Sequence, residues 1–328
     1  MVEHLYVIGN GFDIFSGLNT RYSDFRKWLK FNYAFIYEAL ESAYGLPDIE
    51  WWNDFEVSLG KLDIPKYIKN NTPPAKSMET ILKEIEEKRE KEDRFSPSLI
   101  EMSPCADRLS GLFDVVHYCM KQWVKSMTSI CNPKYLQLEK DNSIFLNFNY
   151  TRTLEMLYEI PKERILHIHG CAQNSEDLIF GHNTIAVGDG RTFDEGKVCD
   201  VLGRYHKNPY VYIFKNSEFF ERLMEVKVVH IYGLSFSPVD IDYLDWIFKQ
   251  TSSETKWEVS WYSAEDAKRI DDFVFEHWAL KKRLKRIQLT PIQESSSFSR
   301  LSQGREICSM DYDDLFPIAI CLDLVKAN

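Results

Sequence analysis

Glycines and polar side chains follow several short apolar runs of this sequence, and their types suit them for chemistry. Each run is a predicted strand that ends in Asn, Asp, His or Ser residues or in glycine. The residues concerned are Gly9, Asn10, Gly11, Asp13, Asn149, His169, His182, Gly233 and Ser235. The carboxyl ends of parallel strands meet at one edge of a sheet, where ligands bind. We therefore expect these residues to share one cleft.

The segment Gly9-Asn10-Gly11-Phe12-Asp13 follows the first apolar run. Two glycines around one residue allow a backbone to approach a phosphate closely. The third glycine of a dinucleotide-binding motif is missing, and so is the Lys-Ser/Thr of a P-loop. A tight strand-to-helix turn is the alternative interpretation.

Asn149 and His169 are the candidate catalytic residues. An Asn carboxamide can hold a ribose hydroxyl or fix a water, although an Asx turn or a helix N-cap is the alternative. His169 is a candidate general base near neutral pH, and a buried, hydrogen-bonded histidine is the alternative. His167 and His169 alternate along one predicted strand, so we expect them on the same face. No carboxylate or cysteine has a spacing that would complete a metal site with them, and His182 is expected in the same cleft.

Gly233 and Ser235 follow a later strand. The glycine permits close approach of the backbone, and the hydroxyl can contact a ribose or a phosphate. A capped helix start, with Asp240 in the first turn, is the structural alternative.

Strands alternate with helices along much of the chain, which predicts an α/β fold with a mostly parallel, doubly wound sheet. The predicted strands are 5–8, 143–150, 165–170, 178–183, 226–232, 257–262 and 286–290. A helix is expected from about Ser23 to Phe35, capped by Ser23 or Asp24. Apolar residues at helical spacing, including those in 79–94 and 109–127, predict a helical insertion. The predicted division is an α/β domain of residues 1–44 and 141–292, an insertion of residues 45–140, and a tail of residues 293–328.

Composition limits the classes of protein that remain. The chain has 328 residues, a net charge of −10 and seven cysteines without CxxC spacing. The acidic balance disfavours nucleic acid as a partner, because a phosphate backbone would need a local basic patch. Only Lys281–Arg286 forms a cationic cluster, and most such runs are solvated helix ends. No signal peptide or membrane span is visible, so we expect a cytoplasmic protein with free thiols.

Seven motifs taken together resemble the bacteriophage abortive infection AbiH family. They span residues 8 to about 247 in order: Ile8-Gly9-Asn10-Gly11-Phe12-Asp13, Tyr22-Ser23-Asp24-Phe25, Trp51-Trp52-Asn53-Asp54-Phe55-Glu56, Phe148-Asn149-Tyr150-Thr151, His167-Ile168-His169-Gly170, Phe180-Gly181-His182-Asn183 and Tyr232-Gly233-Leu234-Ser235. That family in turn resembles, more distantly, the sirtuin-like NAD-binding domains of antiphage NADases.

The resemblance implies a Rossmann-like, sirtuin-like fold with NAD as ligand or substrate. It implies that Gly9, Gly11 and Asp13 lie near phosphate and ribose, that Asn149 lies at the nicotinamide ribose, and that His169 is the base. Gly233 and Ser235 would contact ribose or phosphate. Two departures matter: Thr151 stands where a sirtuin usually has Asp, and the zinc-binding cysteines of the deacylases are absent.

The resulting expectation is an antiphage protein that binds NAD or a related nucleotide and cleaves the nicotinamide–ribose bond. A nucleotide-binding sensor or scaffold without catalysis is the main alternative, and a nuclease is a second. A phage-derived trigger, a host protein and a homo-oligomer remain open as partners.

Overall fold

Six parallel strands form one sheet in the computed structural model, which describes residues 2–71, 103–127, 130, 132–172, 178–184 and 192–292. The strands are β1 (His4–Ile8), β2 (Ser143–Asn147), β3 (Ile165–His167), β4 (Val228–Tyr232), β5 (Lys256–Ser260) and β6 (Leu284–Ile287). Their spatial order is β3-β2-β1-β4-β5-β6. The connections reverse direction between β1 and β4, as in dinucleotide-binding doubly wound folds. The predicted fold class is confirmed.

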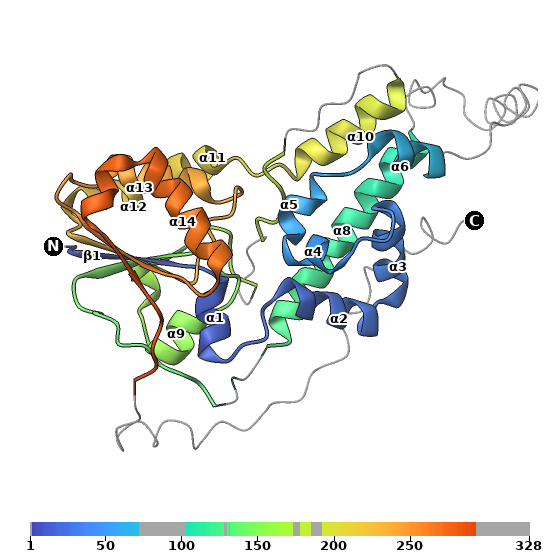
Figure 1. The fold of residues 1–328 in the computed structure, drawn as a ribbon. Coiled ribbons are helices and arrows are strands. Elements are labelled where there is room, and N and C mark those ends of the chain that lie inside the picture. Colours follow the sequence, from blue (N-terminus) through green and yellow to red (C-terminus); the bar gives the residue numbers. More distant parts are fainter. Residues whose placement is uncertain are drawn as a thin grey trace, which may run out of the picture.

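Helices cover both faces of this sheet (Figure 1). One face carries α1 (Asn10–Ser16) and α9 (Thr153–Tyr158), and the other carries α11 (Pro209–Lys215), α12 (Ser217–Glu221), α13 (Ile241–Gln250) and α14 (Ala264–Glu276). Short 3₁₀ helices span Lys162–Arg164, Arg222–Glu225 and Trp278–Lys282. Because β1 is covered on both sides, Leu5 and Val7 enter one core while Tyr6 and Ile8 enter the other. We call the sheet and these helices the sheet lobe.

A second group of helices lies beyond the carboxyl ends of the strands and is called the helical lobe (Figure 1). Its helices are α2 (Tyr22–Asn32), α3 (Ala34–Ala43), α4 (Ile49–Asn53), α5 (Phe55–Leu59), α6 (Ile64–Asn71), α8 (Pro104–Lys125) and α10 (Phe193–Arg204). They share one apolar core, to which α8 contributes the predicted stripe that includes Leu109, Phe113 and Met120. This core also takes in α2, α3 and α10, which lie outside residues 45–140. The run 79–94 and the tail 293–328 lie outside the described residues.

Three predictions about local structure are wrong. Residues 178–183 are not a strand, because their backbone pairs with the segment before α11: His182 N donates to Tyr205 O (3.0 Å) and Lys207 N donates to His182 O (2.7 Å). The helix expected at Ser23–Phe35 is two helices, α2 and α3, separated at Tyr33. Arg21, and neither Ser23 nor Asp24, is the N-cap residue of α2. A further helix, α1, begins directly after Gly9 and was not predicted.

Three glycines let the turn between β1 and α1 pack against the loop after β4. Gly9 N donates to Tyr232 O (3.0 Å) and Gly11 N donates to Gly233 O (2.8 Å). Gly233 has φ +71°, and a Cβ there would lie 2.1 Å from Phe12 N. Glycine is therefore required at these positions, because the backbone of the β1–α1 turn packs directly against the backbone of the loop after β4.

Replacing Gly233 should accordingly destabilise the fold. For Gly233→Ala we expect a loss of at least about 2 kcal/mol, from the positive φ and the clash with Phe12. Gly111→Ala is the control, because Gly111 lies inside α8 with no atom within 4 Å of the added methyl; it should stabilise by about 0.5–1 kcal/mol. Urea unfolding of both variants measures the difference, and equal midpoints would contradict the packing argument.

Candidate functional site

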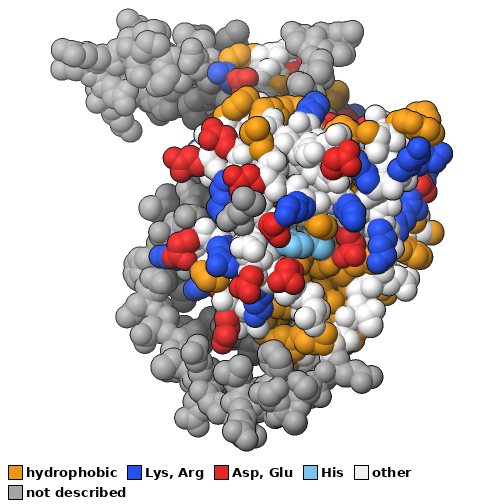
Figure 2. Space-filling view, turned by 90° about the vertical axis from the view of Figure 1, so that its left-hand side faces the viewer, with side chains coloured by type: hydrophobic (Ala, Val, Ile, Leu, Met, Phe, Trp, Pro, Cys, Tyr) orange, Lys and Arg blue, Asp and Glu red, His pale blue; other side chains and the backbone are white. Residues whose placement is uncertain are grey.

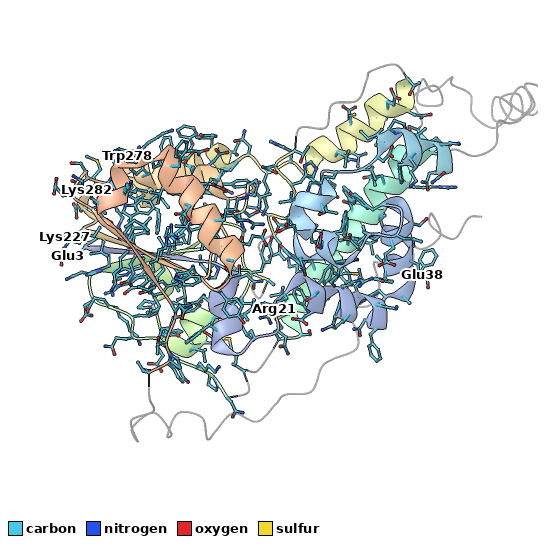
Figure 3. All side chains as sticks on the ribbon, in the orientation of Figure 1. Glu3, Arg21, Glu38, Lys227, Trp278 and Lys282 are labelled. Carbon is cyan, nitrogen blue, oxygen red and sulfur yellow. The ribbon has the colours of Figure 1, made fainter. Side chains whose placement is uncertain are left out.

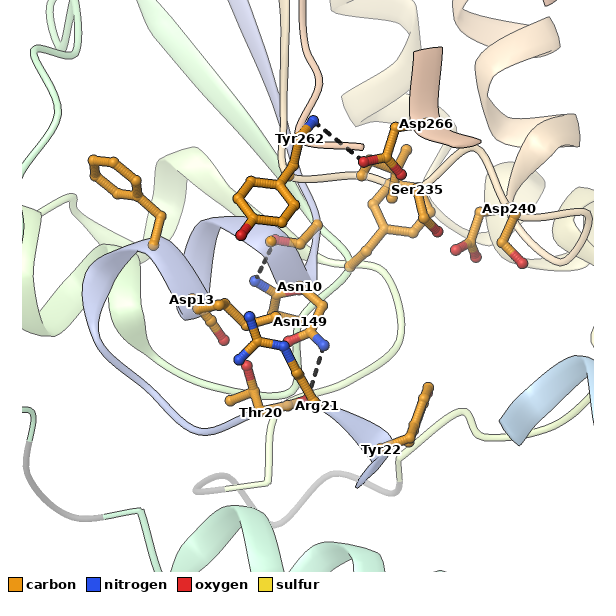
Figure 4. Close-up of a pocket in the computed structure, with 18 of the residues that line it drawn as sticks. Asn10, Asp13, Thr20, Arg21, Tyr22, Asn149, Ser235, Asp240, Tyr262 and Asp266 are labelled. Carbon is orange, nitrogen blue, oxygen red and sulfur yellow. Dashed lines mark hydrogen bonds between the residues drawn. The ribbon is translucent and has the colours of Figure 1, made fainter. Parts of the chain in front are cut away.

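A pocket of about 990 Å³ lies between the two lobes, at the carboxyl ends of the strands. It opens where the strand order reverses, between β1 and β4, which is the usual ligand position in such sheets. The structure brings eight of the nine residues singled out from the sequence into its lining: Gly9, Asn10, Gly11, Asp13, Asn149, His169, Gly233 and Ser235. Figure 4 shows several of them around the pocket.

His182 is the residue that the structure places elsewhere. It is fully buried between the lobes, where a Cβ on Gly60 would lie 2.8 Å from its ring and where it packs against His206. Burial lowers its pKa, and the positive charge of a protonated His206 lowers it further. Its packing suits a structural position at the lobe junction and not the pocket wall.

Asp13 supplies a buried carboxyl group from α1. Its Oδ2 accepts a hydrogen bond from the Thr151 hydroxyl (2.5 Å), whereas its Oδ1 has no hydrogen-bond partner among the described residues. Burial raises the pKa of Asp13 to about 6, although the Thr151 and Thr153 hydroxyls oppose the shift. The pocket therefore contains an acid that changes charge close to neutral pH.

Asn149 is held against the same turn. Its Nδ2 donates to Gly9 O (3.1 Å), and its backbone N donates to the side-chain oxygen of Asn147 (3.0 Å). The carboxamide thus links the loop after β2 to the end of β1.

The backbone amides of the glycine turn are occupied by the protein itself. Besides the bonds of Gly9 and Gly11, Phe12 N donates to Gly9 O (2.9 Å), and Asn10 Nδ2 donates to Thr20 O (2.8 Å). A phosphate at this turn would find few free donors. Arg21 and Lys134 also line the pocket, and their side chains make no ion pair or hydrogen bond within the described part of the chain.

His167 and His169 do not share a face, contrary to the prediction. Strand β3 ends at His167, whose Nε2 lies 3.1 Å from Glu155 Oε1 on the α9 side. A turn closed by Gly170 N donating to His167 O (3.1 Å) then carries His169 to the other side, against Phe148. Because β3 ends at His167, the alternation of side chains between the two faces of the sheet does not continue to His169.

His169 faces a carboxyl group that sequence reasoning did not assign to the site. Its Nε2 lies 3.8 Å from Asp240 Oδ1, and neither atom has a hydrogen-bond partner among the described residues. Burial holds the pKa of His169 well below its usual value, and the Lys207 charge lowers it further. Burial raises the pKa of Asp240 to about 7, against the effect of Lys207. His169 is therefore a neutral imidazole at pH 7.

A buried ion pair joins the lobes beside His169. Lys207 Nζ donates to Glu56 Oε2 (2.5 Å), and the hydroxyls of Tyr22 (2.6 Å) and Tyr150 (2.9 Å) approach Glu56 Oε1. The side chains of Glu56 and Lys207 are 9% and 3% exposed. Glu56 ends one of the motifs quoted above, whereas no pattern around Lys207 distinguishes it from a surface lysine.

The rim of the pocket is formed by the start of α14. Tyr262 is 88% exposed there, and Ser263 and Asp266 form the capping box that begins the helix. Arg269 Nη2 lies 3.6 Å from Asp54 Oδ2 and so spans from α14 to the helical lobe. The Ser263-to-Asp266 spacing is a local signal that could have located this helix start.

The face of the sheet lobe opposite the helical lobe shows Lys, Arg, Asp and Glu side chains interspersed (Figure 2). In the cationic cluster, Arg283 donates to the carbonyl oxygens of Ser252 (2.8 Å) and Thr255 (3.0 Å), and Arg286 pairs with Asp271. Lys285 Nζ also lies 3.9 Å from Glu258 Oε2, so three of the five cationic side chains of the cluster are engaged within the protein. None of the described helices is long and apolar enough to cross a membrane.

Residues 5–261 match the family model for bacteriophage abortive infection AbiH. The chain belongs to the AbiH family. The match begins in β1 and ends just after β5. It therefore includes the pocket-lining residues of both lobes from Gly9 to Trp261. Membership connects this AbiH protein to abortive infection, a defence against bacteriophage, and confirms the family predicted from its motifs. Searches of curated proteins and of solved structures gave no match.

The pKa of Asp13 predicts a pH-dependent stability. Between its usual value near 3.8 and about 6, the folded chain keeps a proton that the unfolded chain has lost. The free energy of unfolding therefore falls as pH rises through this window and remains lower above it. Asp13→Asn removes this cost, so the variant should match the wild type at pH 4 and exceed it at pH 8 by about 1–3 kcal/mol.

Urea unfolding at both pH values provides the measurement. Asp54→Asn, at a side chain that is 50% exposed, removes a carboxylate from the rim and should show no such pH dependence. A constant difference between Asp13→Asn and wild type across this range would refute the assignment.

Proposed function

We propose that this AbiH protein binds NAD or a related ribonucleotide in the pocket and hydrolyses the bond between nicotinamide and ribose. The observation that carries the proposal is a set of four buried polar atoms of pocket-lining residues that lack partners among the described residues: Asp13 Oδ1, Thr20 Oγ1, His169 Nε2 and Asp240 Oδ1. Buried polar atoms are normally paired. A ligand rich in hydroxyl groups supplies the missing partners.

Asp13 is suited to stabilise the transition state. Loss of nicotinamide leaves an oxocarbenium-like ribose, which a nearby carboxylate stabilises electrostatically. Thr151 occupies the position where the resembling sirtuins carry Asp, and its hydroxyl donates to Asp13. The carboxyl group of Asp13, on α1, is the acidic group bonded to that threonine.

His169 and Asn149 complete the proposed reaction. Water attacks C1′ of the ribose as the bond to nicotinamide breaks, and the bonding electrons leave with nicotinamide. The neutral His169 accepts a proton from a ribose hydroxyl or from the attacking water, and Asn149 Oδ1 positions that water. The products are nicotinamide and ADP-ribose.

The charges in the pocket orient such a ligand. Arg21 lies at the junction of the two lobes (Figure 3), and together with Lys134 it offers cationic groups without a described partner. The acidic residues Asp240 and Asp266 lie on the other side of the pocket (Figure 4). The diphosphate would therefore face Arg21 and Lys134, and the uncharged sugar would face His169.

A second function, nucleotide sensing without turnover, is favoured by one observation. The Asn149 carboxamide holds Gly9 O, which is a structural task that requires no reaction. A ligand between two lobes that are linked by ion pairs can also change how the lobes contact each other.

Three alanine variants separate catalysis from sensing. His169→Ala and Asn149→Ala should each lower NAD consumption about 10²–10⁴-fold, because a positioned base or its water is lost. His169→Ala should keep its melting temperature within a few degrees, whereas Asn149→Ala should lower it, because the hydrogen bond to Gly9 O is lost. NAD and nicotinamide are measured in phage-infected cells and with the purified proteins.

His167→Ala is the matched control. It removes an imidazole of the same chain segment that pairs with Glu155 outside the pocket. We expect it to lower the melting temperature and to leave NAD consumption per folded molecule unchanged. Full NAD consumption by folded His169→Ala would favour sensing instead.

A further inference from the structure

His169 and Asp240 are held apart by the packing around them. The His169 ring lies against Phe148 and Tyr243, with ring centroids 5.2 and 5.8 Å away. Asp240 is the N-cap residue of α13, and its backbone N donates to Ser237 O (2.9 Å). The 3.8 Å between Nε2 and Oδ1 is too long for a hydrogen bond. The gap between these two buried atoms is thus a feature of the fold.

Among the described residues, no group bonds to either atom. The positive charge of Lys207 acts on both residues, but Lys207 is itself bonded to Glu56. Both oxygens of Glu56 are in turn engaged, by Lys207 and by the hydroxyls of Tyr22 and Tyr150. The partner of His169 Nε2 and Asp240 Oδ1 therefore has to come from the pocket.

The chemistry of that partner is restricted. A phosphate would be repelled by the carboxyl groups of Asp240 and Glu56, and an apolar group would leave both atoms unpaired. A hydroxyl group both donates and accepts, so it suits His169 and Asp240 in either protonation state. Hydroxyl oxygens lie about 2.7–3.0 Å from their partners, so two adjacent hydroxyls can bond to one atom each.

We propose that His169 Nε2 and Asp240 Oδ1 together bind the vicinal hydroxyls of a ribose, and that Asp240 is the residue by which the pocket selects ribonucleotides over 2′-deoxyribonucleotides. This inference rests on the proposed binding of a nucleotide and adds Asp240 as its specificity-determining residue. It does not depend on turnover, because recognition of the hydroxyls occurs in the ground state as well.

Calorimetric binding of ADP-ribose, compared with its analogue that has a 2-deoxyribose at the terminal sugar, tests the inference. The wild type should bind ADP-ribose at least 10-fold more tightly, because a site built to bond a hydroxyl rejects the analogue that lacks it. Asp240→Ala should weaken the binding of ADP-ribose and make the affinities for the two ligands equal. Asp240→Asn, which retains an acceptor, should keep part of the preference.

Asp54→Asn is the control, since it removes a carboxylate from the same pocket at the rim; it should keep the full preference. Asp240 makes no side-chain capping bond to α13, so its replacement should leave the fold intact, which the melting temperature checks.

The outcomes separate the two proposals. If the protein prefers ADP-ribose but does not hydrolyse NAD, recognition of the ribose hydroxyls by His169 and Asp240 is supported and the proposed hydrolysis is overturned. If the protein hydrolyses NAD but binds the two ligands equally, only the proposed recognition of the ribose hydroxyls is overturned. The same holds if Asp240→Ala keeps the full preference for ADP-ribose. Failure to bind either ligand would overturn both.

Discussion

The buried ion pair of Glu56 and Lys207 is the interaction on which the arrangement of the site depends. It joins α5 of the helical lobe to the segment before α11, and it is almost fully removed from water. Removing one partner of such a pair leaves an uncompensated buried charge, at a cost of about 3–5 kcal/mol. The pair therefore keeps the two lobes in register and gives the pocket a fixed wall.

The same pair determines the electrostatics of its neighbours. Since Lys207 is bonded to Glu56, it acts on His169 and Asp240 only at a distance and leaves them unpaired. Burial then makes His169 neutral and makes the proton on Asp240 labile near neutral pH. Burial thus places a neutral imidazole beside a carboxyl group whose pKa is about 7, next to a salt bridge that bonds to neither of them.

The glycines of the β1–α1 turn have a different role from the one their spacing suggests. They allow the turn to meet the loop after β4, and their amides donate to the carbonyl oxygens of Tyr232 and Gly233. The recognition chemistry of the pocket consequently falls to side chains: the cations Arg21 and Lys134 on one side, and Asp13, His169 and Asp240 on the others.

The sequence by itself determined the fold class, most of the strands and the positions of eight pocket residues. Strand periodicity and the residues that end each strand are local properties, and parallel strands bring those ends to one edge. Tertiary structure alone decided that His169 packs against Phe148, that His182 lies outside the pocket, and that Asp240 lies 3.8 Å from His169 beside the Glu56–Lys207 pair. These outcomes depend on packing between segments up to about 150 residues apart, for which no local pattern in one sequence carries information.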